Sequence, residues 1–279
     1  VTNTTDIATN VTDIATNVTN IAVNSTDVAG IQTDLTEAYD LMPYLDVDPA
    51  SGSISFVGAN LYVQSGAGAT TSAANGTGNL IIGYDENDGT DVKSGSHNLV
   101  VGPDHTYTSV GGVVAGSNNG IEAESAVVIG GTNNRAIGPD AAICGGGAGV
   151  ASGSVATISG GYAGEASGSW STVAGGANNV ASGDSATIAG GGSSLAFGSR
   201  AAVAGGFNNT ANGDWSAVAG GANNIANGEA SSIVGGGAGV AEGSRAAIAG
   251  GYNNTANGDY AVVLGSSGVV VVPDYGFAP

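Results

Sequence analysis

Hydrophobic residues and glycines recur every fifteen residues through the second half of the chain. One unit reads Asp214-Trp-Ser-Ala-Val-Ala-Gly-Gly-Ala-Asn-Asn-Ile-Ala-Asn-Gly228, in which a β-branched residue precedes a glycine pair and an alanine precedes a further glycine. A fixed period of this kind is typical of a solenoid, in which each repeat forms one structural coil. The β-branched column comprises Val128, Ile143, Ile158, Val173, Ile188, Val203, Val218, Ile233, Ile248 and Val263, and the alanine column comprises Ala136, Ala151, Ala166, Ala181, Ala196, Ala211, Ala226, Ala241 and Ala256.

Each unit predicts two short strands that are joined by two tight corners. In the unit above, Ser216–Ala219 and Ile225–Ala226 are the strands, while Gly220–Gly221 and Gly228 permit backbone turns that a Cβ would hinder. A helix is disfavoured because each of the three glycines would cost about 1 kcal/mol relative to alanine. Collagen is excluded because the chain has no Gly-X-Y triplet pattern. We therefore predict a mostly β protein, a narrow parallel β-solenoid with both hydrophobic columns pointing inward.

The first forty residues follow a different, seven-residue pattern. Val11 and Val18 alternate with one hydrophobic column at spacings of three and four residues, which is the seam of a coiled coil. Because Thr, Val and Asn are mediocre helix formers, we expect this helix to form in association with other chains. A second register, with Asn10, Asn17 and Asn24 in the core, remains open. The hydrophobic column comprises Ile7, Ile14, Ile21, Val28, Leu35 and Met42.

The change from one pattern to the other divides the chain into five parts. Pro43 ends the helix, since proline cannot continue a helical hydrogen-bond ladder. A β segment, Ser53–Val63, follows, and the apolar C-terminal tail is expected to cap the last coil. The predicted parts are a coiled-coil stalk (1–42), a β connector (43–78), irregular opening coils (79–123), regular coils (124–265) and a C-terminal cap (266–279).

The opening coils and the regular coils carry a family resemblance. Gly78–Tyr84, Ser94–Gly102 and Val114–Asn119 precede coils with the consensus Ala-Val-x-Ile/Ala-Gly-x-x-Asn-x-Ala-x-Gly. Heptads leading into such coils resemble YadA-like trimeric autotransporter adhesins and related trimeric fibres. The resemblance implies a left-handed parallel β-roll, a homotrimer on a coiled-coil stalk, and an adhesive role. The period here is fifteen residues, whereas fourteen is usual in that family.

The charge balance narrows the choice of partners. The chain has 23 acidic and only 4 basic residues, giving a net charge of −19. Nucleic acid is excluded as a partner, because neutralising phosphates requires clustered Lys and Arg. No stretch of eighteen apolar residues is present, so we expect no membrane insertion of this chain. The lone Cys144 stands where other coils carry Ala or Ser, which predicts a small apolar filler.

Candidate chemistry is sparse. His97 and His105 are the only histidines, and neither belongs to a Ser/His/Asp or Cys/His arrangement, so we expect no enzymatic activity and no cofactor. Asp85, Asn87 and Asp91 offer alternate oxygen ligands, as calcium loops do. Because the required glycine position and a distant Glu are missing, an acidic turn is favoured over a metal site.

A 45-residue superperiod gives the sharper functional hint. Aromatic residues occupy two repeat columns at intervals of three coils, and Arg200 and Arg245 follow the same interval. Duplication of a three-coil block, with aromatics packing between chains, is one interpretation. The other is receptor contact through rings that stack on sugars. The receptor-contact candidates are Trp170, Trp215 and Tyr260 in one column and Tyr162, Phe207 and Tyr252 in the other.

These patterns lead to one main functional hypothesis and one alternative. We expect a non-enzymatic trimeric surface fibre or adhesin head that attaches to cells, glycans or matrix. The alternative is a virus or injection-system tail fibre that recognises a host receptor. In both cases the partners are other copies of the chain and a cell-surface receptor or glycan, and the location is extracellular, on a cell or virion surface.

Overall fold

The computed structural model describes residues 2–279, which form two compact units with a boundary between Tyr62 and Val63. The first unit begins with a long helix, α1 (Thr2–Leu41), and a short 3-10 turn, η1 (Met42–Tyr44). Pro43 lies in this turn and ends the helix one residue before the predicted boundary. An antiparallel hairpin of β1 (Leu45–Asp48) and β2 (Ser53–Phe56) follows. The predicted β segment therefore keeps only its first four residues as a strand.

The helix exposes its hydrophobic seam within the single chain. Ile14 and Val18 are each 61% exposed, and the remaining seam residues are similarly open. Threonine hydroxyls donate hydrogen bonds to backbone carbonyls one turn earlier in the helix; Thr12, for example, donates to the Ala8 carbonyl at 3.0 Å. Neither of the two predicted heptad registers is favoured over the other, because the core side chains of both are exposed in the single chain.

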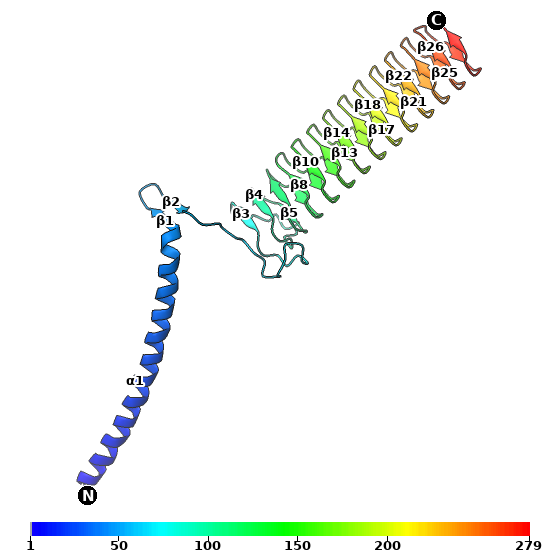
Figure 1. The fold of residues 1–279 in the computed structure, drawn as a ribbon. Coiled ribbons are helices and arrows are strands. Elements are labelled where there is room, and N and C mark those ends of the chain that lie inside the picture. The colour runs from blue at the N-terminus through cyan, green and yellow to red at the C-terminus, as the bar shows by residue number, and fades with distance from the viewer. Residues whose placement is uncertain (1) are drawn as a thin grey trace. The chain divides into compact units, whose positions relative to one another are not determined.

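The second unit is a parallel β-solenoid built from two facing sheets (Figure 1). One sheet has 14 strands and the other has 12. The first comprises β3 (Leu80–Ile82), β4 (Leu99–Val101), β6 (Val113–Ala115), β8 (Val127–Val128), β10 (Ala142–Ile143), β12 (Thr157–Ile158), β14 (Thr172–Val173), β16 (Thr187–Ile188), β18 (Ala202–Val203), β20 (Ala217–Val218), β22 (Ser232–Ile233), β24 (Ala247–Ile248), β26 (Val262–Val263) and β28 (Phe277–Ala278). The second comprises β5 (Thr106–Tyr107), β7 (Gly120–Ile121), β9 (Arg135–Ala136), β11 (Val150–Ala151), β13 (Glu165–Ala166), β15 (Val180–Ala181), β17 (Leu195–Ala196), β19 (Thr210–Ala211), β21 (Ile225–Ala226), β23 (Val240–Ala241), β25 (Thr255–Ala256) and β27 (Val270–Val271).

The register confirms the coil length in the regular part and shows a shorter coil before it. Val203 pairs with Val218, fifteen residues later. In the opening coils, Leu99 pairs with Val113 and Val113 with Val127, fourteen residues apart. The first opening coil is longer, since Leu80 pairs with Leu99 nineteen residues later, and the coils become regular at fifteen residues only after Val127.

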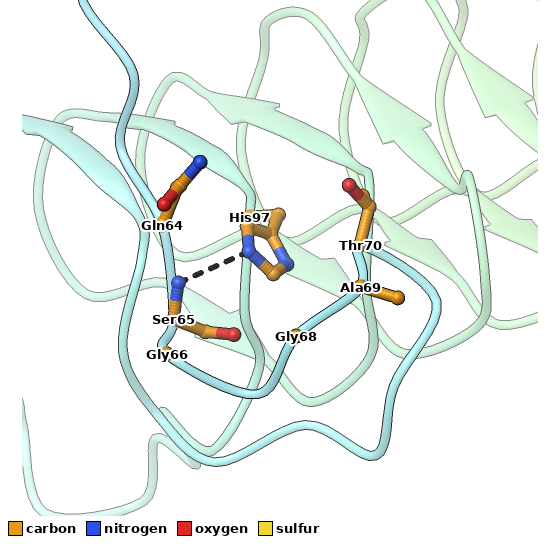
Figure 2. A pocket seen from close by; sticks show the side chains of 7 residues that line it. All are labelled: Gln64, Ser65, Gly66, Gly68, Ala69, Thr70 and His97. Carbon is orange, nitrogen blue, oxygen red and sulfur yellow. Dashed lines mark hydrogen bonds between the residues drawn. The ribbon is translucent and has the colours of Figure 1, made fainter.

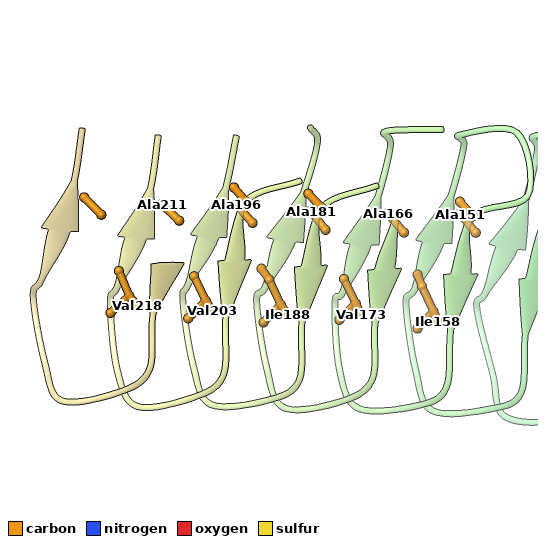
Figure 3. Close-up of a cluster of buried hydrophobic side chains, with 14 of the residues drawn as sticks. Ala151, Ile158, Ala166, Val173, Ala181, Ile188, Ala196, Val203, Ala211 and Val218 are labelled. Atoms are coloured by element: carbon orange, nitrogen blue, oxygen red, sulfur yellow. The ribbon is translucent and has the colours of Figure 1, made fainter. Parts of the chain in front are cut away.

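The interior consists of the two predicted columns (Figure 3). Every member of the Val128–Val263 column and of the Ala136–Ala256 column is at most 1% exposed. The prediction that both columns point inward is confirmed. One large and one small side chain alternate across the narrow space between the sheets, so each coil fills its interior with few atoms.

Three glycine columns have three different roles at the corners. Gly220, the first of its pair, faces open space. Gly221 has φ +84°, and a Cβ there would lie 2.7 Å from the Asn224 amide nitrogen. Gly228 has no positive φ, but a Cβ would collide with the backbone carbonyl of Gly243 in the next coil. The second and third columns therefore need glycine, whereas the first does not.

Buried asparagines complete one corner as an internal ladder. The Asn224 N–H donates to the side-chain oxygen of Asn209 at 3.0 Å. The Asn224 side-chain amide donates to the carbonyls of Gly220 and Gly236, at 2.9 and 3.2 Å. Each asparagine thus supplies the hydrogen bonds that the turning backbone cannot make for itself.

Two expectations are corrected by the structure. Residues 266–279 continue the solenoid as a further coil, because Val270–Val271 pairs in register with Thr255–Ala256 and Val271 enters the alanine column. Cys144 is exposed and does not fill the interior, since it follows the buried Ile143 on a strand whose side chains alternate between faces. Among the described residues, no helix combines the length and apolar character that a membrane span requires.

Candidate functional site

One corner of the solenoid carries a continuous column of exposed side chains, which we name the ladder edge. It lies between each strand of the 12-stranded sheet and the next strand of the 14-stranded sheet; Trp215, for example, stands between β19 and β20. Successive members are fifteen residues apart and are tied by backbone bonds such as that from the Arg200 N–H to the Asp184 carbonyl, 2.8 Å. The ladder edge comprises Trp170, Ser185, Arg200, Trp215, Ala230, Arg245, Tyr260 and Tyr275.

Every residue of the ladder edge has a left-handed backbone. Trp215 has φ +55° and Arg200 has φ +58°, a conformation that costs an L-residue roughly 1–2 kcal/mol. At the opposite corner the left-handed positions are often Asn, such as Asn208 and Asn223, which tolerates this conformation better than bulky residues do. Tryptophan and arginine are therefore not here for backbone reasons. The same conformation recurs at both corners along the solenoid, so the aromatic and arginine side chains, and not the backbone, distinguish this column.

Contacts along the ladder edge place cations on aromatic faces. The Arg200 guanidinium carbon lies 5.2 Å from the Trp215 ring centroid, and that of Arg245 lies 5.4 Å from Tyr260. Arg245 also donates to the Tyr260 hydroxyl at 2.9 Å. Tyr260 and Tyr275 stack with centroids 4.8 Å apart and planes 3° apart. Neighbouring coils therefore stack two tyrosine rings and hold two guanidinium groups over aromatic rings.

The ladder edge is open to solvent and bordered by carboxylates. Trp170 is 63% exposed, and Trp215 and Tyr260 are also exposed. A second column, one residue earlier in each coil, is largely acidic; Asp214 accepts the Ser199 N–H at 2.8 Å. The acidic members beside the ladder edge are Asp184, Asp214, Glu229, Asp259 and Asp274.

The second aromatic column lies at the opposite corner, so the structure does not bring the two columns together. Tyr162, Phe207 and Tyr252 are each at least 60% exposed. Each ring covers a glycine of the preceding coil: a Cβ on Gly237 would meet the Tyr252 ring at 3.1 Å, and Gly147 and Gly192 are covered in the same way. These rings shield bare backbone, which gives them a structural reason to recur every 45 residues.

The acidic loop of the opening coils carries its own cation. Lys93 forms an ion pair with Asp85 at 2.8 Å and also donates to the carbonyl oxygens of Asp85 and Glu86. The Tyr107 hydroxyl donates to the other Asp85 oxygen at 2.9 Å. Burial, and then this hydrogen bond and the negative charge of Asp85, raise the pKa of Tyr107. The carboxylate proposed as a weak metal ligand is thus engaged by a lysine and a tyrosine that the sequence did not single out.

The other two weak candidates of this loop lie apart from that ion pair. The Asn87 side-chain oxygen accepts the Gly89 N–H at 2.7 Å. One Asp91 oxygen is buried without a hydrogen-bond partner. Among the residues that the structure describes, no group of three His, Cys, Asp or Glu side chains could hold a metal ion.

A cavity of about 330 Å³ lies beside His97, under the loop of residues 64–70 (Figure 2). The Ser65 N–H donates to the ring atom Nε2 of His97 at 3.1 Å, so Nδ1 carries the proton in the neutral ring. That Nδ1 is buried and has no partner. His97 is the single titratable side chain that lines this cavity, which leaves no second group for acid–base work.

His105 is a member of the internal asparagine ladder. It is fully buried, its Nδ1 accepts the Asn119 N–H at 3.2 Å, and its Nε2 contacts the Val101 carbonyl at 3.0 Å. Asn119 makes the matching pair of bonds one coil later, by accepting the Asn134 N–H and donating to the Ala115 carbonyl. The imidazole of His105 therefore makes the same two backbone contacts that an asparagine side chain makes in the next coil.

Comparison with known proteins gives no family: no family model matches the chain, and no curated protein matches it. The ladder edge therefore carries the functional argument through its own geometry. Of the four basic residues, Lys93 and Arg135 pair with acids, whereas Arg200 and Arg245 stack on aromatic rings. The repeated arrangement suits the binding of ring-shaped groups.

Proposed function

We propose that this protein is part of a non-enzymatic, trimeric surface fibre that attaches to cells, glycans or matrix outside the cell. The observation that carries the proposal is the ladder edge, a solvent-exposed line of aromatic and arginine side chains held in a strained backbone conformation. Aromatic faces offer a large contact area at little cost in side-chain entropy. A rigid solenoid presents them at a fixed spacing, which suits multivalent attachment.

An uncharged sheet supports the assembly part of the proposal. None of the residues in the 14 strands of the larger sheet is charged, although the chain carries 23 acidic residues. The residue after most of these strands is also exposed and uncharged, and most are small enough for close approach of a second copy. These exposed residues are Ile129, Cys144, Ser159, Ala174, Ala189, Ala204, Ala219, Val234, Ala249 and Leu264. Such a face can pack against the same face of other chains without burying an unpaired charge.

The stalk supports the same assembly. Its seam of Ile, Val and Leu side chains is exposed in the single chain, and exposed seams of this length are covered in coiled coils. The fourteen-residue period of the opening coils equals the period usual in YadA-like heads, which favours the left-handed, three-chain arrangement that the resemblance implies.

Two measurements test the proposal with the full chain. Sedimentation of the purified protein should give a homotrimer, and a stable folded monomer would contradict it. Labelled protein should attach to cell or glycan surfaces, and the triple variant Trp170→Ala, Trp215→Ala, Tyr260→Ala should attach more weakly at an unchanged melting temperature. Equal attachment by this variant would remove the ladder edge from the proposal.

A further inference from the structure

The ladder edge contains two gaps of the same construction. In chain order it reads Trp170–Ser185–Arg200 and then Trp215–Ala230–Arg245, so an aromatic, a small residue and an arginine occupy three successive coils. Adjacent coils are about 4.8 Å apart, which places each aromatic roughly 9.6 Å from its arginine with only a small side chain between them. We name these gaps the ring slots.

The far wall of each ring slot is held in place by the next aromatic. Arg200 stacks on Trp215, and Arg245 stacks on Tyr260 and donates to its hydroxyl. Each guanidinium therefore stands one coil beyond the small residue and closes that side of the slot. The near wall is the indole of Trp170 or Trp215, both of which are exposed.

The third block of the ladder edge shows what a filled slot looks like. There the coil after Tyr260 carries Tyr275 in the position of Ser185 and Ala230, with the same left-handed backbone at φ +57°. Its ring lies parallel to Tyr260 at a centroid distance of 4.8 Å, one coil spacing away. A ring therefore fits at this level of the column, and the other two slots lack one.

The chemistry around the slots favours a neutral sugar ring. Asp184 and Glu229 directly precede the two small residues, so each slot has a carboxylate on its own coil and an arginine on the next. A carboxylate only accepts hydrogen bonds and a guanidinium only donates them, which together match hydroxyl groups that do both. The width of roughly 9.6 Å leaves more room than two flat-ring contacts of 3.5–4.0 Å need, which suits a puckered pyranose.

We infer that the two ring slots each bind one neutral hexopyranose ring, sandwiched between the tryptophan and the arginine. This inference rests on the proposed attachment function and names the class of group that is attached. Because the ring plane lies across the fibre, a bound polysaccharide crosses the ladder edge and the two slots act separately. An acidic sugar is disfavoured by the net charge of −19, since the arginine of each slot is already offset by Asp184 or Glu229.

Tryptophan fluorescence of the assembled full chain tests the inference directly. The chain has only two tryptophans, and both form slot walls. Titration with maltopentaose, mannopentaose or galactopentaose should change the emission, whereas trigalacturonate should not. The double variant Ser185→Tyr, Ala230→Tyr copies the Tyr275 arrangement and should weaken the sugar response by at least about tenfold.

A control variant separates the effect of filling a slot from the effect of adding a tyrosine ring to the column. Ser125→Tyr adds the same ring in the same column and backbone conformation, three coils away from Trp170, and should leave the response unchanged. A response to trigalacturonate alone, or to none of the probes, overturns the neutral-sugar slots. If the slot-filled variant attaches to surfaces as well as wild type while the tryptophan variants fail, the slots are wrong and the attachment function stands. Wild-type protein that attaches to no surface contradicts the attachment function itself.

Discussion

Alanine at the two glycines of one pair should have opposite effects on stability. Gly220 and Gly221 are adjacent in sequence, but Gly220 faces open space and lacks a positive φ, whereas Gly221 has φ +84°. A Cβ on Gly221 would collide with the backbone carbonyl oxygen of Gly236 in the next coil and would also lie 2.7 Å from the side-chain nitrogen of Asn224. Alanine at Gly221 therefore strains the backbone and displaces a ladder asparagine in one step.

The expected magnitude follows from those contacts. A left-handed alanine costs about 1–2 kcal/mol. The Asn224 amide makes two hydrogen bonds, to Gly220 and Gly236, and losing them adds about 1 kcal/mol each. Gly221→Ala should therefore lower the free energy of opening this corner by roughly 3–4 kcal/mol. Gly220→Ala should change it by less than about 1 kcal/mol, on the stabilising side, because alanine restricts the unfolded chain.

Hydrogen exchange is the suitable assay, because a stacked repeat array opens locally and a single melting transition averages over its coils. The Ala222 N–H donates to the Gly236 carbonyl at 3.0 Å, and its protection reports on the corner. The pair Gly205→Ala and Gly206→Ala in the preceding coil should reproduce the contrast, since Gly205 is open and Gly206 has φ +86°. Equal loss of protection in both members of a pair would refute the assigned roles of the two glycines.

Substitutions at three further positions test the interior. Val218→Asp buries an unpaired charge in the core column and should destabilise its coil by about 3–5 kcal/mol, seen as lost amide protection in that coil and its neighbours. Ser216→Ala should raise the melting temperature, because the buried Ser216 hydroxyl lacks a partner and Ala201 already fills the same column; a lower melting temperature would reveal a missed partner. His105→Asn should keep the stability within about 1 kcal/mol, whereas His105→Ala should cost about 1–3 kcal/mol by leaving the Asn119 N–H unpaired, as denaturation can measure.

The fold was accessible from the sequence because a strict period fixes register. Once Val203 and Val218 occupy equivalent positions, the alternation along a strand decides which neighbours face inward. Cys144 was misplaced because the comparison with Ala and Ser in other coils concerned size and ignored this alternation. The C-terminal tail was misread because Val271 breaks the alanine column in sequence, yet it still fits the interior as the last residue of that column.

The candidate site was accessible in part. The 45-residue interval identified the Trp170 and Tyr162 columns. It could not show that the rings of the Trp170 column stand on a left-handed corner, whereas those of the Tyr162 column cover the backbone of a glycine. A signal was present, since Gly147, Gly192 and Gly237 precede Tyr162, Phe207 and Tyr252 by one coil each. The stacking of Arg200 on Trp215 also follows from their fifteen-residue separation. The left-handed backbone of the ladder edge could not be foreseen, because Trp and Arg are among the residues least expected there.

The coincidence of one aromatic–small–arginine set with one 45-residue block has an evolutionary consequence. Because each block begins and ends in the same register, duplicating or deleting one at the gene level lengthens or shortens the solenoid without disturbing its interior. Each such event adds or removes one complete set of surface groups. The number of binding groups per chain then follows the number of 45-residue blocks. The avidity of the fibre can therefore change during evolution without any change in the chemistry of a single contact.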